Sequence, residues 1–127
     1  MARDHRDMLE VLRFELYVLQ QGGYRTGNAG GWAPMSYFRD SPTCLNFGET
    51  ALRRPCRDCL LAEFIPGNYQ NETPACHKIS LDEHGNTIAS LGRGYNQLAV
   101  EEAVFGWLRE TVARLERERR QEQVACP

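Results

Sequence analysis

The sequence predicts an α+β protein in which N-terminal and C-terminal helices flank a metal-clamped loop region with a small β-hairpin. Three observations lead to this prediction. Apolar residues recur at helical spacing at both ends of the chain, four of the five cysteines gather in the middle, and two short alternating runs follow them. The length of 127 residues suits one domain and no internal repeat is present, so we expect residues 1–127 to form a single small domain.

The first expected element is a helix over residues 4–21. Its apolar stripe consists of leucines three or four residues apart: Leu9, Leu12, Leu16 and Leu19. Gly22 and Gly23 favour the end of this helix, because glycine readily adopts the left-handed conformation that closes helices. Residues 22–43 are then expected to form a Gly-rich loop and, at residues 35–39, a short strand.

Residues 44–76 are expected to form a four-cysteine metal region. Cys44, Cys56, Cys59 and Cys76 follow the order C-x11-C-x2-C-x16-C, and several turn residues lie between them. Four thiolates, two of them from a tight C-x2-C pair, match the ligand number and type of a structural zinc site. A Zn2+ ion held in this way has no open coordination position, so the pattern predicts scaffolding rather than catalysis.

Three alternatives stay open for these cysteines. A [4Fe–4S] cluster also takes four cysteines, although the wide spacing matches neither compact ferredoxin pattern. A thiol–disulfide role for Cys56 and Cys59 lacks the βαβ context of thioredoxin-like motifs, and unliganded buried thiols are the plainest alternative. His77 stands beside Cys76 and is the alternative fourth ligand, because zinc accepts imidazole as well as thiolate.

The last two expected elements follow the cysteines. Residues 77–91 are expected to form a β-hairpin, because short alternating runs at 78–81 and 87–91 flank a turn-rich loop. Residues 97–123 are expected to form a helix with an apolar stripe: Val100, Val104, Leu108, Val112 and Leu115. Past this stripe the residues are mainly charged, so we expect a projecting charged tail.

Three arginines surround the C-x2-C pair: Arg53, Arg54 and Arg57. They are candidates for contact with an anion or with nucleic acid, as in zinc modules that bind RNA. Their second interpretation is charge compensation, because four thiolates around a divalent ion leave a net negative charge that guanidinium groups offset.

Other features limit the classes of function. The formal net charge of −2 disfavours a protein that holds nucleic acid mainly by charge. The Gly-rich stretch lacks the Gly-Lys-Ser/Thr ending of a phosphate loop, so we expect no nucleotide site, and no catalytic motif is present. Without a long apolar run or a secretory signal, we expect a cytoplasmic protein that makes no membrane contact and keeps its thiols reduced.

Together these features predict a small zinc-stabilised, non-enzymatic binding or adaptor module. Its partner would be another protein, a second copy of the chain bound through the helices, or RNA. The alternative is an iron–sulfur redox or sensor protein that carries a [4Fe–4S] cluster on the four cysteines.

Overall fold

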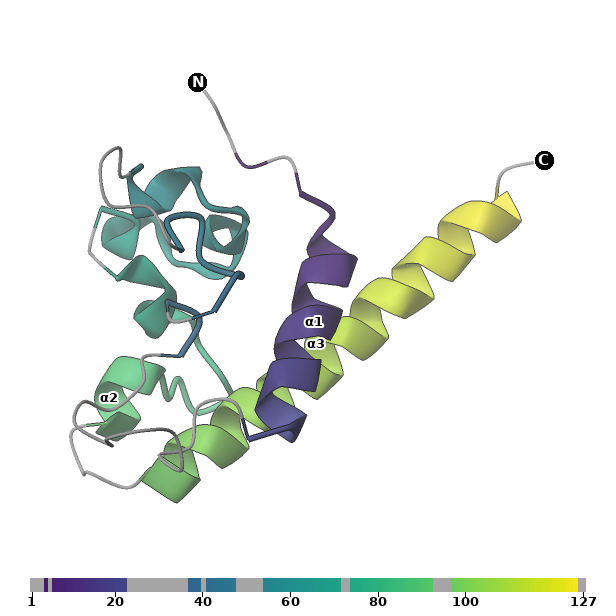
Figure 1. The fold of residues 1–127 in the computed structure, drawn as a ribbon. Helices are drawn as coiled ribbons and strands as arrows, with labels where there is room; N and C mark the ends of the chain where they lie inside the picture. Colours follow the sequence, from purple (N-terminus) through teal and green to yellow (C-terminus); the bar gives the residue numbers. More distant parts are fainter. Residues whose placement is uncertain are drawn as a thin grey trace.

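Two long helices form one side of the molecule. The computed structural model describes residues 4, 6–22, 37–39, 41–47, 54–71, 74–92 and 97–125. Helix α1 (Met8–Gln20) lies against helix α3 (Gln97–Ala125), and the C-terminal part of α3 extends beyond the rest of the chain (Figure 1). Ion pairs Arg13–Glu116 and Asp7–Arg119 show that the two helices run antiparallel, because the residue number rises in one helix as it falls in the other.

Helix α1 begins at Met8 and not at residue 4, because Asp7 caps it. The Asp7 carboxylate accepts a hydrogen bond of 3.1 Å from the backbone N–H of Glu10, which satisfies one of the free donors of the first turn. The pair of acids three residues apart is a recognised start signal for helices. The cap leaves Asp4 and Arg6 outside the helix, where they become available to the cysteine region.

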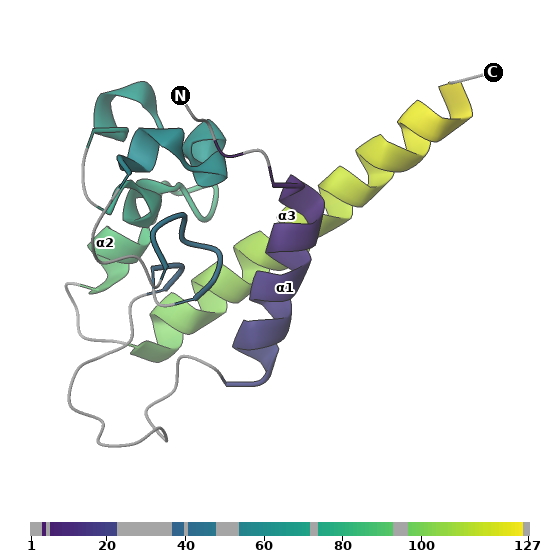
Figure 2. The same ribbon diagram turned by 45° about the horizontal axis from the view of Figure 1, so that its top comes forward.

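The middle of the chain is built from short 3-10 helices. These are η1 (Cys56–Asp58), η2 (Leu60–Phe64), η3 (Gly67–Tyr69) and η4 (Ala75–Lys78). With the turns near residue 38 and at residues 41–47, they form what we call the cysteine half, meaning the described residues between 37 and 79; α1 and α3 form the helical half. Figure 2 shows the cysteine half and the short helix α2 (Ile88–Gly92) gathered beside α3.

The apolar core joins the two halves through α3. Trp107 of α3 receives the rings of Phe38 and Phe64 edge-on, with centroid distances of 6.1 and 5.2 Å. Such perpendicular contacts suit the charge distribution of aromatic rings. On the other side of α3, the buried leucines of α1 complete the same core. Helix α3 is therefore the element on which both halves pack.

The predicted β-hairpin is wrong, and with it the α+β class: the described residues are helical and contain no strand or sheet. Residues 88–92 form helix α2 instead. The reason lies in Thr87 and Ser90, which cap each other: Ser90 N–H donates to Thr87 Oγ1 at 3.0 Å, and Thr87 N–H donates to Ser90 Oγ at 2.9 Å. This reciprocal arrangement begins a helix.

The short strand expected at residues 35–39 is likewise a turn in its described part, Tyr37–Arg39; residues 35 and 36 lie outside the described residues. Phe38 adopts a φ of 68°, which an extended strand cannot contain. Its ring is fully buried, so packing against Trp107 supports a backbone conformation that phenylalanine rarely adopts. Within the described ranges, no helix combines the length and apolar character needed to cross a membrane.

Candidate metal centre

The C-x2-C pair lies on a single tight turn. Pro55 precedes η1, and the backbone N–H of Cys59 donates to the carbonyl of Cys56 at 3.0 Å. Pro55 suits the position before η1, because its backbone is extended there, with φ −67° and ψ 150°, and a proline ring fixes φ near this value. The turn therefore delivers two sulfur atoms from one short segment.

Cys44 comes from a separate turn at residues 41–47. Its sulfur accepts a hydrogen bond of 3.4 Å from the backbone N–H of Asn46. The side chain of Asn46 in turn holds the backbone of Arg54, donating to its carbonyl at 2.8 Å and accepting from its N–H at 2.7 Å. Asn46 thus ties the Cys44 turn to the chain that leads into Cys56, and it is a site residue that the cysteine pattern did not reveal.

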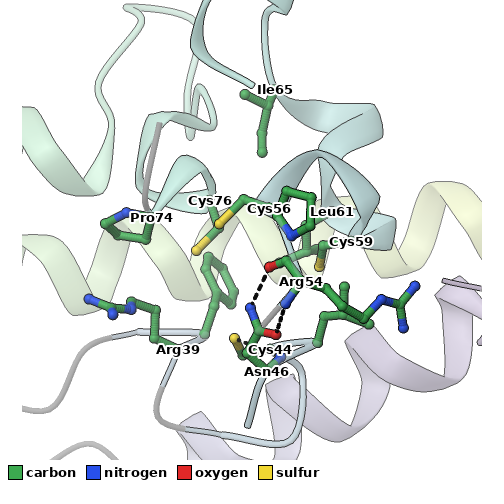
Figure 3. Close-up of a pocket in the computed structure, with 13 residues that line it drawn as sticks. Arg39, Cys44, Asn46, Arg54, Cys56, Cys59, Leu61, Ile65, Pro74 and Cys76 are labelled. Atoms are coloured by element: carbon green, nitrogen blue, oxygen red, sulfur yellow. Dashed lines mark hydrogen bonds between the residues drawn. The ribbon is translucent and has the colours of Figure 1, made fainter. Parts of the chain in front are cut away.

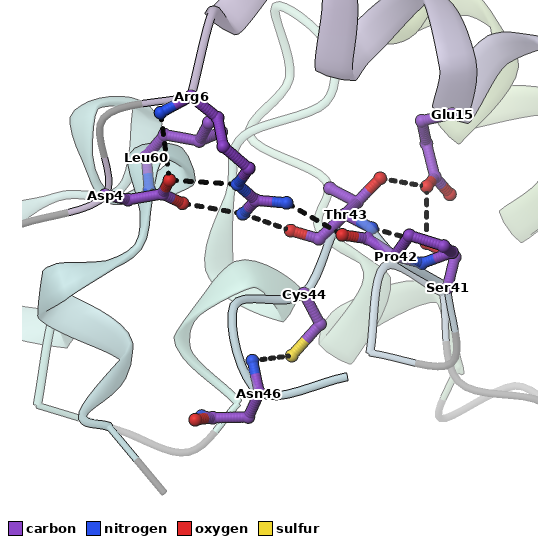
Figure 4. Close-up of polar contacts among 9 residues, drawn as sticks. All are labelled: Asp4, Arg6, Glu15, Ser41, Pro42, Thr43, Cys44, Asn46 and Leu60. Atoms are coloured by element: carbon purple, nitrogen blue, oxygen red, sulfur yellow. Dashed lines mark hydrogen bonds and ion pairs between the residues drawn. The ribbon is translucent and has the colours of Figure 1, made fainter. Parts of the chain in front are cut away.

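Helix α1 supports the Cys44 turn through Glu15. Glu15 is fully buried on α1, and its carboxylate accepts hydrogen bonds from Ser41 Oγ, at 2.6 Å, and from Thr43 Oγ1 (Figure 4). A buried carboxylate needs such donors because it has left its water shell. The turn that carries Cys44 is therefore anchored on the helical half.

Cys76 reaches the centre from η4, and His77 does not. Cys76 lines the same cavity as the other three cysteines, whereas His77 is not one of the lining residues. The Nε2 atom of His77 lies 3.0 Å from the backbone carbonyl of Tyr37. Of the two candidates for the fourth ligand, the described structure thus brings Cys76 to the centre.

All four predicted cysteine ligands line one cavity of about 330 Å3, the cysteine cavity. Much of the remaining wall is apolar: Phe38, Leu45, Pro55, Leu61, Ile65 and Pro74. Figure 3 shows the sulfur atoms spread around the cavity rather than gathered at one point. All four thiols are free and half-buried. The cavity is thus a thiol-lined, otherwise largely apolar chamber.

The spread of the sulfur atoms bears on what the cavity can hold. Nowhere among the described residues do three His, Cys, Asp or Glu side chains lie close enough together to hold one metal ion. A tetrahedral zinc ion with bonds of about 2.3 Å draws its four sulfur atoms to within about 4 Å of one another. A [4Fe–4S] cluster instead places a separate iron in front of each cysteine, so it spans a wider cavity.

Burial is the main influence on the pKa of two cavity cysteines, Cys59 and Cys76. It raises the pKa of Cys59, against hydrogen bonds from the backbone N–H groups of Leu61 and Leu45. Burial also raises the pKa of Cys76, and the other three cysteines of the cavity raise it further. Without a cation the neutral thiol is therefore favoured at Cys59 and Cys76, whereas a bound metal would reverse this preference and displace the protons.

The arginines predicted for anion contact separate in the structure. Arg54 lines the cysteine cavity, and its Nη2 atom is buried without a hydrogen-bond partner among the described residues. Arg57 is exposed, with its guanidinium 3.5 Å from Asn71, and Arg53 lies outside the described residues. Arg39, which the sequence did not single out, also lines the cavity. Nucleic-acid contact by these arginines stays a prediction.

Comparison of the chain with protein-family models, with curated proteins and with solved structures finds no match.

Proposed function

We propose that this chain is a small iron–sulfur protein that works, without catalysing a reaction itself, as a redox carrier or sensor. Cys44, Cys56, Cys59 and Cys76 hold a [4Fe–4S] cluster. The observation that carries the proposal is the convergence of these cysteines, which come from three separate segments, on one cavity of about 330 Å3. A structural zinc site needs no chamber of this size, because four thiolates close directly around the ion.

The side chains that line the cysteine cavity also favour a cluster over a zinc ion. Apolar side chains such as Leu61 and Ile65 limit the access of water, and backbone N–H groups point at the sulfur atoms of Cys44 and Cys59. Burial and hydrogen bonds to sulfur are two of the factors that set the potential of a cluster. Arg39 and Arg54, which also line the cavity, supply positive charge near the thiolates.

The number of ligands favours electron transfer or sensing over catalysis. With one cysteine for each iron, a cubic cluster keeps no open position at which a substrate could bind. The described cavity also brings no histidine or carboxylate to its wall that could act as an acid or base. The cluster would therefore respond to the redox state of its surroundings or to a partner at the surface.

The test is anaerobic purification followed by iron, sulfide and zinc analysis. We expect a brown protein with absorbance near about 400 nm and four iron and four sulfide ions per chain. Replacing any one cavity cysteine, for example Cys76→Ser, should remove most of the colour. Cys126→Ser is the matched control, because Cys126 stands near the C-terminus and outside the predicted ligand set.

Three results would overturn the [4Fe–4S] cluster. A colourless protein with one zinc per chain would restore the structural zinc site expected from the spacing. A protein that binds neither metal under anaerobic conditions would leave four unliganded thiols. Two iron and two sulfide ions per chain would replace the cubic cluster by a binuclear one.

An adaptor that acts through a protein partner is the second candidate function. The observation that favours it is an exposed aromatic pair on α1: Phe14 and Tyr17 are 46% and 57% exposed, with ring centroids 6.4 Å apart. Exposed apolar patches often mark interaction sites. Light scattering of the full chain tests self-association, and Phe14→Ser should reduce any association that this pair mediates.

A further inference from the structure

The N-terminal segment before α1 contacts both cysteine-bearing turns. The backbone N–H of Asp4 donates to the carbonyl of Asp58 at 3.0 Å, and its carboxylate accepts from the N–H of Leu60 at 3.2 Å. These two contacts lie on either side of Cys59. Asp4 is therefore fixed to the chain that carries the C-x2-C pair.

Arg6 makes the matching contacts on the other turn. Its Nη1 atom donates to the carbonyl of Pro42 at 2.7 Å, and its Nη2 atom donates to the carbonyl of Thr43 at 2.9 Å (Figure 4). Thr43 immediately precedes Cys44. Arg6 thus holds the backbone of the Cys44 turn by two donors of one guanidinium group.

A fork of hydrogen bonds joins the two residues. Arg6 Nε donates to Asp4 Oδ1 at 2.9 Å, and Arg6 Nη2 donates to Asp4 Oδ2 at 2.6 Å. The Asp4 side chain is only 3% exposed, so water screens this pair less than an ordinary surface ion pair. Bidentate pairs of this kind fix orientation as well as contributing energy.

The same hydrogen bonds stabilise the charged forms of Asp4 and Arg6. Burial raises the pKa of Asp4, but the hydrogen bonds from Arg6 and Leu60 outweigh it and lower the pKa from 3.8 to about 2. The Asp4 carboxylate also raises the pKa of Arg6, against burial, and the nearby Cys59 and Cys44 raise it further. Arg6 therefore remains charged within electrostatic reach of two cavity cysteines.

We infer that Asp4 and Arg6 are positioning residues that clamp the Cys44 turn to the C-x2-C turn and thereby hold the cofactor ligands in place. The cofactor's identity in this inference rests on the proposed function, whereas the clamp acts on any metal that the four cysteines bind. A second effect follows from the charge: Arg6 lowers the cost of adding an electron to a nearby negative cluster.

The experiment compares metal release and reduction potential in the full-length metal-loaded protein. The variants are Arg6→Gln, Arg6→Lys and Asp4→Asn. The control is Arg13→Gln, because Arg13 makes two hydrogen bonds to Glu116 on the helical half, away from the cysteines. Release is followed by absorbance with excess chelator, and circular dichroism confirms that each variant is folded.

We expect Arg6→Gln and Asp4→Asn to release the metal about tenfold faster than the wild type, as is typical when the support of metal ligands is removed. Arg6→Gln should also lower the reduction potential. Arg6→Lys keeps the charge but loses the fork, so its potential should stay near that of the wild type while its release remains fast. Arg13→Gln should resemble the wild type in both measurements.

The clamp is overturned if Arg6→Gln and Asp4→Asn release metal at the rate of Arg13→Gln. Should Arg6→Gln fail to fold, Asp4→Asn and Arg6→Lys decide the question by the same comparison. A wild-type protein that carries zinc would refute the cluster but leave the release measurement intact. Failure of the proposed function and failure of the clamp therefore give different results.

Discussion

The helical half and the cysteine half are built on different principles. In the helical half, regular backbone hydrogen bonds and an apolar stripe are enough to define α1 and α3, and their buried residues fill the space between them. In the cysteine half, the described backbone forms only short 3-10 helices and turns, arranged around a cavity that no side chain fills. The two halves share one apolar core, but only the cysteine half is arranged around a cavity, which four cysteines line.

This difference indicates where the stability of each half comes from. A packed helix pair gains stability from apolar burial. Short 3-10 helices gain little from their own hydrogen bonds, so we expect the cysteine half to depend on its buried residues and, under the proposed function, on bound metal. We therefore expect the two halves to respond differently when either apolar contacts or the cofactor are removed.

Removal of the proposed cofactor should have the largest effect, and it should fall on the cysteine half. Binding of metal to four thiolates contributes more than about 5 kcal/mol in small metal-stabilised domains. We expect the stripped, reduced protein to lose hydrogen-exchange protection over residues 54–79, while α1 and α3 keep most of theirs. Hydrogen exchange with mass spectrometry on the loaded and stripped protein measures this. An equal loss of hydrogen-exchange protection in both halves would contradict the expected difference between them.

Truncation of a core residue on α3 should instead destabilise the helical half. Leu108 on α3 is fully buried, so Leu108→Ala should lower the free energy of unfolding by about 2–5 kcal/mol. The matched control on the same helix is Leu98→Ala, because Leu98 is 69% exposed and its truncation should change stability by less than about 0.5 kcal/mol. Denaturant unfolding of the loaded protein gives both values. Similar values for the two variants would contradict the assigned core.

Glu15 tests the joint between the halves. Glu15→Gln keeps the shape of the side chain but removes its charge, and it weakens the two hydrogen bonds from Ser41 and Thr43. We expect a loss of about 1–3 kcal/mol, since hydrogen bonds to a charged group are stronger than neutral ones. Metal release should also accelerate, because the Cys44 turn rests on these bonds. If stability falls while the rate of metal release is unchanged, Glu15 stabilises the helical half alone.

The sequence predicted the helical half better than the cysteine half, for a physical reason. Residues such as Leu12 and Leu108 recur at the spacing of one helix face, and this periodicity is a local property of the chain. The start of α1 was equally local: Asp7 and Glu10 form the pattern of a helix cap, which the expected start at residue 4 overlooked. Both features can be found by inspecting a few neighbouring residues.

The failed hairpin shows the limit of periodicity. The run at residues 87–91 alternates, but Ile88 and Leu91 also stand three apart, so a segment of five residues fits either period. The reciprocal hydrogen bonds between Thr87 and Ser90 favour the helix over a strand. In segments this short, capping side chains carry more information than the apolar pattern.

The contacts that hold the cysteine-bearing turns in place could not be predicted from local patterns. The cysteine spacing pointed to the four residues that line the cavity, but Arg6 contacts Thr43 from 37 positions away and Glu15 contacts Ser41 from 26 positions away. Such pairs depend on how the halves pack, and single polar residues carry no periodic signal. The spacing of the cysteines likewise indicates the number of ligands and not the volume between them, so zinc stays an untested prediction.

The exposed ion pair Arg13–Glu116 should contribute least, and it sharpens the contrast with the Asp4–Arg6 pair, in which Arg6 is 35% exposed but Asp4 only 3%. The Arg13 and Glu116 side chains are 52% and 35% exposed, so water and salt screen their attraction even though the distance is 2.7 Å. A double-mutant cycle with Arg13→Gln and Glu116→Gln should give a coupling of about 0.2–1 kcal/mol that disappears in high salt. The same cycle on Asp4 and Arg6 should give a larger coupling that persists in high salt, because Asp4 is buried. Equal couplings for the two pairs would mean that the contact between Asp4 and Arg6 is an ordinary surface ion pair.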